Sequence, residues 1–473
     1  MASSGAALAQ DASKAQDEEE RVDAKRFEVV LQSAMVGVLA AGTATLQARQ
    51  LLVTQTATPL GEEAVLAASG GLARAYSLGS LAELFLSPSF GRFSERFGRK
   101  PVLLSLLVGP ACMRSLCVAI KQPSTRIRML CLDFASARVI GVQPMIAIAQ
   151  TMISDMFPKH LQAAAQSRLK AASALGQIIG NYASGWWNAR AGPQSTYVVT
   201  AAIPMMCFAY LSACLPETNR GTASSNKALQ GRPQGEATPT EASAAATPVA
   251  PAKRSGAFRT VFCDPECCLL AATLGLYEFM TYPPMNTVSI FFMKERLGWG
   301  PLQAGRFASG VALSTFSGSM LAAWVKLAIE RIVGDALGGK LFVSLAHCLT
   351  SLAYVLWGTA QTGRQMVACL LPLALGAGAN PMVLTRFYAR AESLGLSRGE
   401  AAGVNQAIGA AGRMVAPQLF LRLWLWAAAQ RDSKAARARL RLPLGSPMLA
   451  VALVALAQEA LHQGSWFARA SFV

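Results

Sequence analysis

Long apolar stretches separated by short polar segments run through most of the 473-residue chain. Each is long enough to cross the ~30 Å hydrocarbon core of a bilayer as a helix. Six in the first part lie near residues 27–46, 71–90, 101–120, 129–156 and 168–187, with the sixth ending at Leu215. Six more lie near 267–293, 302–323, 341–360, 364–386, 400–426 and 446–462. The pattern predicts an all-α integral membrane protein with twelve transmembrane helices in two six-helix halves.

Composition changes sharply at two places and divides the chain. Residues 1–26 are polar and acidic, which predicts a disordered cytoplasmic tail. Residues 217–260 alternate Ala, Pro, Thr, Ser and Gly, a low-complexity pattern that cannot bury a core. We therefore expect a tail, an N-terminal half at 27–216, a cytoplasmic linker and a C-terminal half at 261–473. Six spans on either side of the linker place both termini in the cytoplasm.

The chain is 53% hydrophobic and only 15% charged, with a mean hydropathy of +0.35, as expected for a membrane protein. Its formal net charge of +17 indicates cytoplasmic loops facing anionic lipid headgroups rather than a nucleic-acid partner. We find no nucleophile–base pair, metal-ligand spacing or phosphate-binding loop in the sequence. We therefore predict a membrane protein that is not an enzyme and has no cofactor. We also expect it to be a monomer.

The segment 91–101, between the second and third apolar stretches, is strongly basic. Four Lys or Arg residues directly beside two membrane spans predict a cytoplasmic loop. Gly91 and Gly98 allow backbone conformations and close approaches that other residues do not. Glu95 is the one acid of the segment.

This segment resembles the loop 2–3 signature of the major facilitator superfamily, Gly-x-x-x-Asp-Arg-x-Gly-Arg-Arg/Lys. Glu95 stands where the family usually has Asp. The resemblance implies a charge contact of Arg96 or Arg99 with Asp155, at the end of the fourth span, that holds one closed state. The matching residues are Gly91, Arg96, Gly98, Arg99 and Lys100. A weaker echo at Glu330–Gly334, after the eighth span, indicates an internal duplication.

A glycine-rich stretch in the fifth span resembles the motif Gly-x-x-x-Gly-Pro-x-x-Gly-Gly of drug–proton antiporters. Gly176, Gly180 and Gly185 match, whereas Asn181 replaces the proline. The chain looks closest to the tetracycline-efflux-like branch. The resemblance implies a secondary active transporter, an antiporter in that branch, that moves a small organic solute or ion by alternating access with protons as coupling ion. The glycines are expected to let helices pack closely.

Ionisable residues inside membrane spans are costly, which makes them candidates for the transport pathway. Arg138 lies about nine residues into the fourth span, and the family resemblance places it in a central cavity; a structural bond to backbone carbonyls is the alternative. Asp133 is nearer the outer end, where interfacial solvation is the alternative. The two side chains are five residues apart and point about 140° from each other, so we do not expect them to pair.

Glu278, near the middle of the seventh span, is the predicted proton acceptor, with a structural carboxylate as the alternative. It precedes Tyr282-Pro283-Pro284, whose double proline predicts a break in the helix. Glu83 in the second span and Arg413 in the eleventh are predicted to form a salt bridge between the halves, across an expected depth difference of ~7 Å. His347 is interpreted as a lone structural residue.

Two alternatives stay open from the sequence. The altered motifs also fit a sensor, receptor or scaffold that has a transporter fold and moves nothing. The basic segment 431–441 falls in an outer loop, against the positive-inside trend. It is either an amphipathic helix on the membrane surface or a sign that the last two spans are placed differently.

Overall fold

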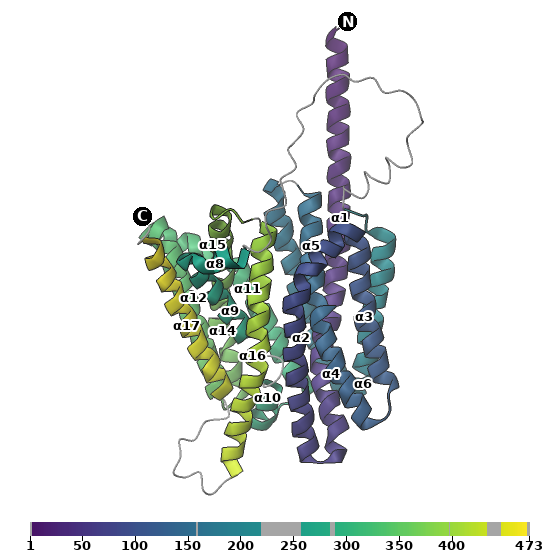
Figure 1. Cartoon of the computed structure of the whole chain (residues 1–473), viewed down its shortest axis with the longest axis vertical. Coiled ribbons are helices and arrows are strands. Elements are labelled where there is room, and N and C mark those ends of the chain that lie inside the picture. Colours follow the sequence, from purple (N-terminus) through teal and green to yellow (C-terminus); the bar gives the residue numbers. More distant parts are fainter. Residues whose placement is uncertain are drawn as a thin grey trace.

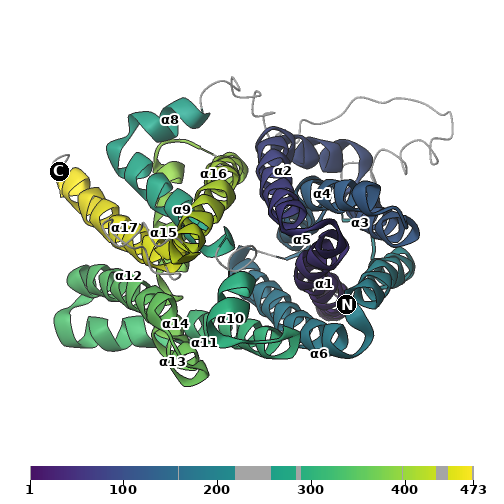
Figure 2. The same cartoon turned by 90° about the horizontal axis from the view of Figure 1, so that it is seen from below.

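The computed structural model describes residues 2–157, 159–218, 257–283, 289–396, 398–432 and 446–470. Within these ranges the regular structure is entirely helical, which confirms the predicted all-α class. The helices form two bundles side by side, α1–α6 and α8–α17 (Figures 1 and 2). We call them the N-terminal and C-terminal bundles.

The N-terminal bundle departs from straight, separate spans in two places. The fourth predicted span is broken at Ile140 and Gly141, and the fifth and sixth are joined through a bend at Gly192 (φ 79°). Its elements are α1 (Ala2–Ala57), the 3-10 turn η1 (Thr58–Leu60), α2 (Glu62–Phe97), α3 (Arg99–Ala119), α4 (Pro123–Val139), α5 (Val142–Met156) and α6 (Lys159–Cys214).

In the C-terminal bundle the described part of α9 reaches Pro283, and α10 begins at Ser289. Residues 284–288, which include the second proline, fall outside the described residues, so the predicted break in the seventh span stays a prediction. Proline lacks the N–H that would continue the helix. The elements are α8 (Ala257–Cys263), α9 (Pro265–Pro283), α10 (Ser289–Leu297), α11 (Pro301–Val333), α12 (Asp335–Thr359), α13 (Gly363–Ala368), α14 (Leu370–Gly376), α15 (Ala379–Ser393), α16 (Arg398–Asp432) and α17 (Ser446–Ala470).

Among the described residues, six helices are long and apolar enough to cross a membrane, and two bent helix pairs raise this number to eight. The twelve-span count stays a prediction, which the described elements fit. Helix α1 begins at Ala2, so helix continues back through the segment for which the sequence predicted a disordered tail. Alanine is the commonest residue of that segment and, with its glutamates, favours helix once a neighbouring span has nucleated it.

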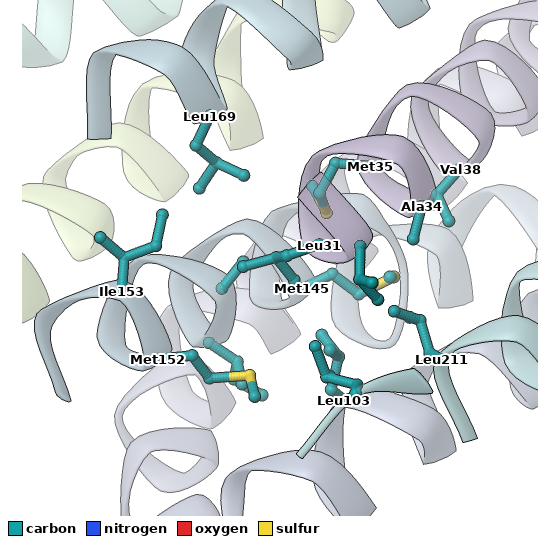
Figure 3. Packing of buried hydrophobic residues seen from close by; sticks show 14 of the residues in the cluster. Leu31, Ala34, Met35, Val38, Leu103, Met145, Met152, Ile153, Leu169 and Leu211 are labelled. Carbon is teal, nitrogen blue, oxygen red and sulfur yellow. The ribbon is translucent and has the colours of Figure 1, made fainter. Parts of the chain in front are cut away.

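Each bundle has its own apolar core. In the N-terminal bundle, Leu31 and Met35 of α1 meet Leu103 of α3, Met152 of α5 and Leu211 of α6 (Figure 3). In the C-terminal bundle the core gathers around Trp357, whose ring lies edge-on to Phe307 at a centroid distance of 4.9 Å. Separate cores let each bundle move as a unit.

The two bundles repeat one turn. Gly98 (φ 98°, ψ 151°) joins α2 to α3, and Gly334 (φ 86°, ψ 155°) joins α11 to α12. Positive φ favours glycine, so both turns depend on that residue. The similarity between Glu95–Gly98 and Glu330–Gly334 therefore has a structural counterpart, which supports the predicted duplication.

The start of α1 and the end of α17 lie at the same end of the molecule, which we call the terminal face (Figure 1). The lower ends of α16 and α17 lie at the opposite face. Most of the basic segment 431–441, and most of the linker 217–260, fall outside the described residues. Their predicted topology therefore stays a prediction.

Candidate functional site

Four charged side chains form a continuous chain of ion pairs between the two bundles. Nη2 of Arg138 (α4) lies 2.7 Å from Oε2 of Glu83 (α2). The other oxygen of Glu83 lies 3.0 Å from Nη2 of Arg413 on α16. Nη1 of Arg413 lies 2.5 Å from Oε2 of Glu278 on α9. We call these four residues the central charge network.

Burial differs sharply along this network. The side chains of Glu83 and Arg413 are 3% and 2% exposed, whereas that of Glu278 is 31% exposed. Buried charges are stable only when they are paired and hydrogen-bonded, which three of the members achieve through one another. Glu278 is thus the most exposed of the four side chains.

Glycines explain why the helices bring these side chains together. A Cβ on Gly79, one turn before Glu83, would lie 2.5 Å from the backbone oxygen of Ala135 on α4. A Cβ on Gly412, beside Arg413, would lie 2.7 Å from the backbone oxygen of Gly275 on α9. Both helix pairs therefore approach closely only because the side chain is absent.

The predicted contact between Glu83 and Arg413 is present, and the expected difference in depth is not. Glu83 lies 14 residues before the end of α2 at Phe97, and Arg413 lies 15 residues after the start of α16 at Arg398. The sequence had placed the ends of these helices wrongly. It also missed that Glu83 bonds Arg138, and that Arg413 bonds Glu278. The backbone of Tyr282 lies in α9, and its side chain falls outside the described part of the structure.

Asp133 belongs to a second buried cluster within the N-terminal bundle. Its Oδ2 accepts hydrogen bonds from Nη2 (2.6 Å) and Nε (3.0 Å) of Arg49, and from the Tyr197 hydroxyl (3.1 Å). The side chain is 1% exposed, so interfacial solvation was the wrong interpretation. Arg49 was missed because the first span was predicted to end at Leu46, whereas α1 continues to Ala57.

A cavity of about 90 Å³ lies between these two clusters and is lined by residues of α1 to α6. Arg49 and Arg138 reach it, together with Arg114 of α3, which the sequence analysis did not single out. The Arg49 guanidinium lies 4.5 Å from the Phe134 ring centroid, and that of Arg138 lies 5.1 Å from the Tyr76 ring centroid. Such stacking holds each guanidinium in place.

At the terminal face, the predicted contact of Arg99 with Asp155 is present, with Nε 3.2 Å from Oδ2. Glu217, which follows α6, accepts hydrogen bonds from the backbone N–H groups of Arg99 (2.9 Å) and Lys100 (3.1 Å). It thereby caps the start of α3, where N–H groups lack partners within the helix. Glu217 lies just after the predicted end of the sixth span, and the sequence did not indicate this capping role.

The rest of the basic segment differs from the predicted loop. Helix α2 runs through Gly91 and Glu95 to Phe97, and Gly98 alone makes the turn into α3. Arg96 is exposed and lies over the Phe97 ring, so it is not the partner of Asp155. The side chain of Glu95 falls outside the residues that the structure describes.

Comparison with known proteins identifies the family. The model of the Major Facilitator Superfamily matches residues 34–417, most of the chain. The chain belongs to the major facilitator superfamily. The superfamily is one of transporters, so the chain is a multi-pass integral membrane protein. No curated protein sequence matches it at a significant level.

Solved structures of major facilitator transporters share this fold at low identity. The human organic anion transporter MFSD10 (TETRAN) has 15% identity and a TM-score of 0.58, covering 93% of this chain and 99% of that one. A bacterial homolog of the human lysosomal transporter Spinster, in an inward-facing conformation, has 14% identity and a TM-score of 0.60, covering 92% and 97%. A D-xylose–proton symporter has 15% identity and a TM-score of 0.58, covering 91% and 97%.

The glycines of the fifth span have two kinds of partner in this major facilitator fold. Gly176 and Gly180 pack against the backbone of α1 at Val36 and Ala40. Gly185 instead faces α11 of the other bundle, where a Cβ would lie 2.9 Å from Cα of Gly305. Asn181, which stands at the motif's proline, accepts a hydrogen bond of 3.1 Å from Gln47 of α1.

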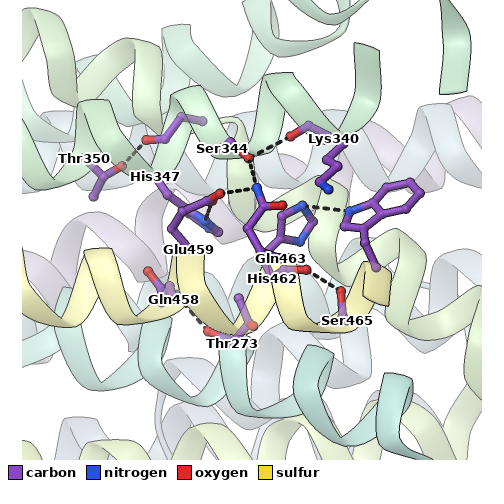
Figure 4. Close-up of polar contacts among 12 residues, drawn as sticks. Thr273, Lys340, Ser344, His347, Thr350, Gln458, Glu459, His462, Gln463 and Ser465 are labelled. Atoms are coloured by element: carbon purple, nitrogen blue, oxygen red, sulfur yellow. Dashed lines mark hydrogen bonds and ion pairs between the residues drawn. The ribbon is translucent and has the colours of Figure 1, made fainter. Parts of the chain in front are cut away.

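His347 is not alone, contrary to the prediction. Its Nδ1 lies 3.1 Å from Oε2 of Glu459 on α17, and Gln463 donates to the other oxygen of Glu459 at 2.5 Å (Figure 4). His462 lies beside them and accepts from Trp466 at 3.2 Å. Glu459 is thus the hydrogen-bonded partner of His347, and the His462 ring lies edge-on to the His347 ring at a centroid distance of 5.9 Å.

One ionic contact fixes the terminal face of the C-terminal bundle. Arg390 of α15 donates to both carboxylate oxygens of Asp264, at 3.1 and 2.5 Å. These hydrogen bonds hold the pKa of Asp264 below its ordinary value. Asp264 also accepts from the backbone N–H of Cys267 and so caps α9.

Proposed function

We propose that the chain is a proton-coupled secondary transporter of a small organic solute or ion, and that the central charge network couples the proton to the movement of the bundles. The observation that carries this proposal is the position of Arg413. It bonds Glu83 of one bundle and Glu278 of its own, and Glu278 is one-third exposed.

Protonation of Glu278 acts on the contact between the bundles through Arg413. When Glu278 loses its charge, Glu83 is the remaining anionic partner of Arg413 in this network, and Glu83 also forms an ion pair with Arg138. Proton binding therefore changes the strength of the one ion pair that crosses between the bundles in this network. A difference of a few kcal/mol is enough to exchange the populations of two states.

Alternating access supplies the movement. The bundles rock about the central network, and each half of the cycle opens the site to one side of the membrane. The contact of Arg99 with Asp155 and the capping of α3 by Glu217 stiffen the terminal face in the described state. In our proposal this face is the cytoplasmic one, so both termini lie inside the cell. The proposed carrier is a monomer surrounded by lipid.

Similarity to known transporters supports the coupling without setting its direction. The D-xylose–proton symporter has the same fold and takes protons as coupling ion. The glycine motif at Gly176–Gly185 instead favours the tetracycline-efflux-like branch and exchange against protons. Asn181 replaces the motif's proline and bonds α1, so both directions must be measured.

Flux in proteoliposomes tests the proposal. Reconstituted protein is given a mixed panel of organic solutes under an imposed pH difference, and transported compounds are identified by mass spectrometry. We expect accumulation that depends on the gradient. In Glu278→Gln the accumulation should fall at least tenfold while solute exchange without a gradient continues, because the proton site is lost and the solute site is not.

Glu295→Gln is the matched control, since Glu295 is an exposed carboxylate on α10 outside the central network. Unchanged accumulation in Glu278→Gln would refute the role of Glu278. Binding of a solute with no flux under any gradient would favour a sensor or receptor with a transporter fold instead.

A further inference from the structure

Arg114 is a buried cation without an acidic partner. It is 5% exposed, and its Nη1 donates to the backbone oxygen of Thr200 at 2.6 Å. Its Nε is buried with no hydrogen-bond partner, and no ion pair of the described residues includes it. The Asp133 carboxylate attracts Arg114 but already bonds Arg49, and burial of an incompletely compensated charge is unfavourable, so an anion beside Arg114 would stabilise it.

The guanidinium of Arg114 lines the 90 Å³ cavity of the N-terminal bundle, together with Arg49 and Arg138. Among the described residues, no carboxylate lines this cavity. Asp133 neutralises Arg49, and Glu83 neutralises Arg138 but is shared with Arg413. The described groups around the cavity thus carry an excess of positive charge.

The break between α4 and α5 places the N-terminus of α5 at the cavity, beside the last turn of α4. Helix α5 begins at Val142, and Gly141, Val142 and Gln143 line the cavity. The N–H groups in the first turn of a helix are free of intrahelical partners and favour an anion. A buried arginine and a helix N-terminus therefore reach one space from different elements.

The size and walls of the cavity restrict the ligand. A water molecule needs about 10–15 Å³ of such space, so the cavity has room for about six to nine non-hydrogen atoms. Apolar side chains complete the wall beside the cations, among them Leu106, Phe134 and Pro204. This combination suits an anionic group attached to a compact apolar body.

We propose that this cavity binds a small organic monoanion, with its carboxylate on Arg114 and Arg138 and its apolar part against the aromatic and aliphatic wall. The proposal rests on the proposed function, since it names the substrate class of the transporter. It adds a site inside one bundle, beside the central charge network and linked to it through Arg138.

Binding to the purified full-length protein tests the site without any flux. Benzoate and its neutral isostere benzamide are titrated at fixed pH by isothermal calorimetry, with chloride as the inorganic probe. We expect benzoate to bind at least tenfold more tightly than benzamide or chloride. Equal affinity for benzamide would overturn the proposal, and so would competition by chloride at benzoate-like affinity, which would assign an inorganic anion site.

Variants then locate the site. Arg114→Gln should weaken benzoate binding at least tenfold, and Arg114→Lys should retain part of it because the charge stays. Arg74→Gln is the matched control, since Arg74 is an exposed arginine of α2 outside the cavity. Unchanged affinity in a folded Arg114→Gln would overturn the assignment, and the comparison of benzoate with benzamide stands even where that variant does not fold.

The two proposals fail in different ways. If gradient-driven flux is found for neutral solutes but benzoate does not bind, the anion site is wrong and the transporter stands. If benzoate binds and depends on Arg114 but no solute crosses the membrane, the site stands and proton-coupled transport is wrong. Glu278→Gln should lose coupling while it keeps benzoate binding at fixed pH.

Discussion

The ion pair of Glu83 with Arg413 should stabilise the described state against the other state of the cycle. We consider Glu83→Gln, Arg413→Gln and the double variant. Exchange of the two charges is a poorer test, because an arginine at position 83 would face Arg138 and a glutamate at position 413 would face Glu278. Neutral substitutions avoid these new repulsions.

The size of the effect follows from the partners that remain. Removal of one member of a buried ion pair costs ~3–5 kcal/mol. Here Glu83 keeps Arg138, and Glu278 is less buried than the other members of the network, so part of that cost is offset. We expect a coupling between the two sites of ~2–3 kcal/mol, or about a 30- to 150-fold change in the ratio of states.

Single-molecule fluorescence transfer measures that ratio. Dyes are placed at Phe97 and Ile332, which are exposed ends of α2 and α11 at the terminal face, one in each bundle. They are attached through non-canonical amino acids because the chain has ten cysteines. Arg422→Gln is the control, as Arg422 is an exposed arginine on the same helix as Arg413.

Each single variant should lower the population of the described state, and the double variant should lower it less than the sum of the two. If the populations of both single variants equal those of the wild type, the pair persists in both states. Glu83 and Arg413 would then form a pivot and have no part in selecting the state.

Two further predictions concern helix contacts. Glu217→Ala removes both hydrogen bonds that cap α3 and should lower the stability by ~0.5–2 kcal/mol, measured as a lower melting temperature. Glu217→Gln keeps an acceptor oxygen and should melt closer to the wild type. Equal melting temperatures of the two variants would argue against capping. Gly185→Ala places a Cβ 2.9 Å from Cα of Gly305 and should reduce flux at least tenfold, because α6 can no longer close on α11. Gly403→Ala is the control: its added Cβ meets nothing within 4 Å, so flux should stay unchanged.

The sequence predicted features that depend on the pattern along a single helix. It predicted only some of the contacts between helices. The apolar stretches and the glycine motifs gave the helical class and the family. Glu83 and Arg413 could be paired because the family resemblance places the second and eleventh spans side by side, and charges buried within spans need partners. Their other bonds, to Arg138 and Glu278, depend on how α4 and α9 pack, which one sequence does not specify.

The missed residues share a physical cause. Arg49 lies just past the predicted end of the first span, and Glu459 lies near the end of the last one. In the structure each pairs with another ionisable residue, Asp133 and His347 respectively. A charge near the end of an apolar stretch is therefore as informative as one in the middle, because its partner extends the helix past the apparent limit. Arg114 is an ionisable residue inside the third predicted span, so its signal was present and was overlooked, whereas its cavity is lined by six helices together and could not be read from the sequence.

The central charge network has two arginines and two carboxylates, and so its charges cancel. A proton on Glu278 adds one positive charge, and a monoanion beside Arg138 adds one negative charge. If both cross in the same step, the loaded carrier is electrically equivalent to the empty one and membrane voltage does no work on it. If they cross in opposite steps, each cycle moves two elementary charges, worth about 2.3 kcal/mol apiece per 100 mV. Voltage sensitivity alone would thus distinguish symport from exchange.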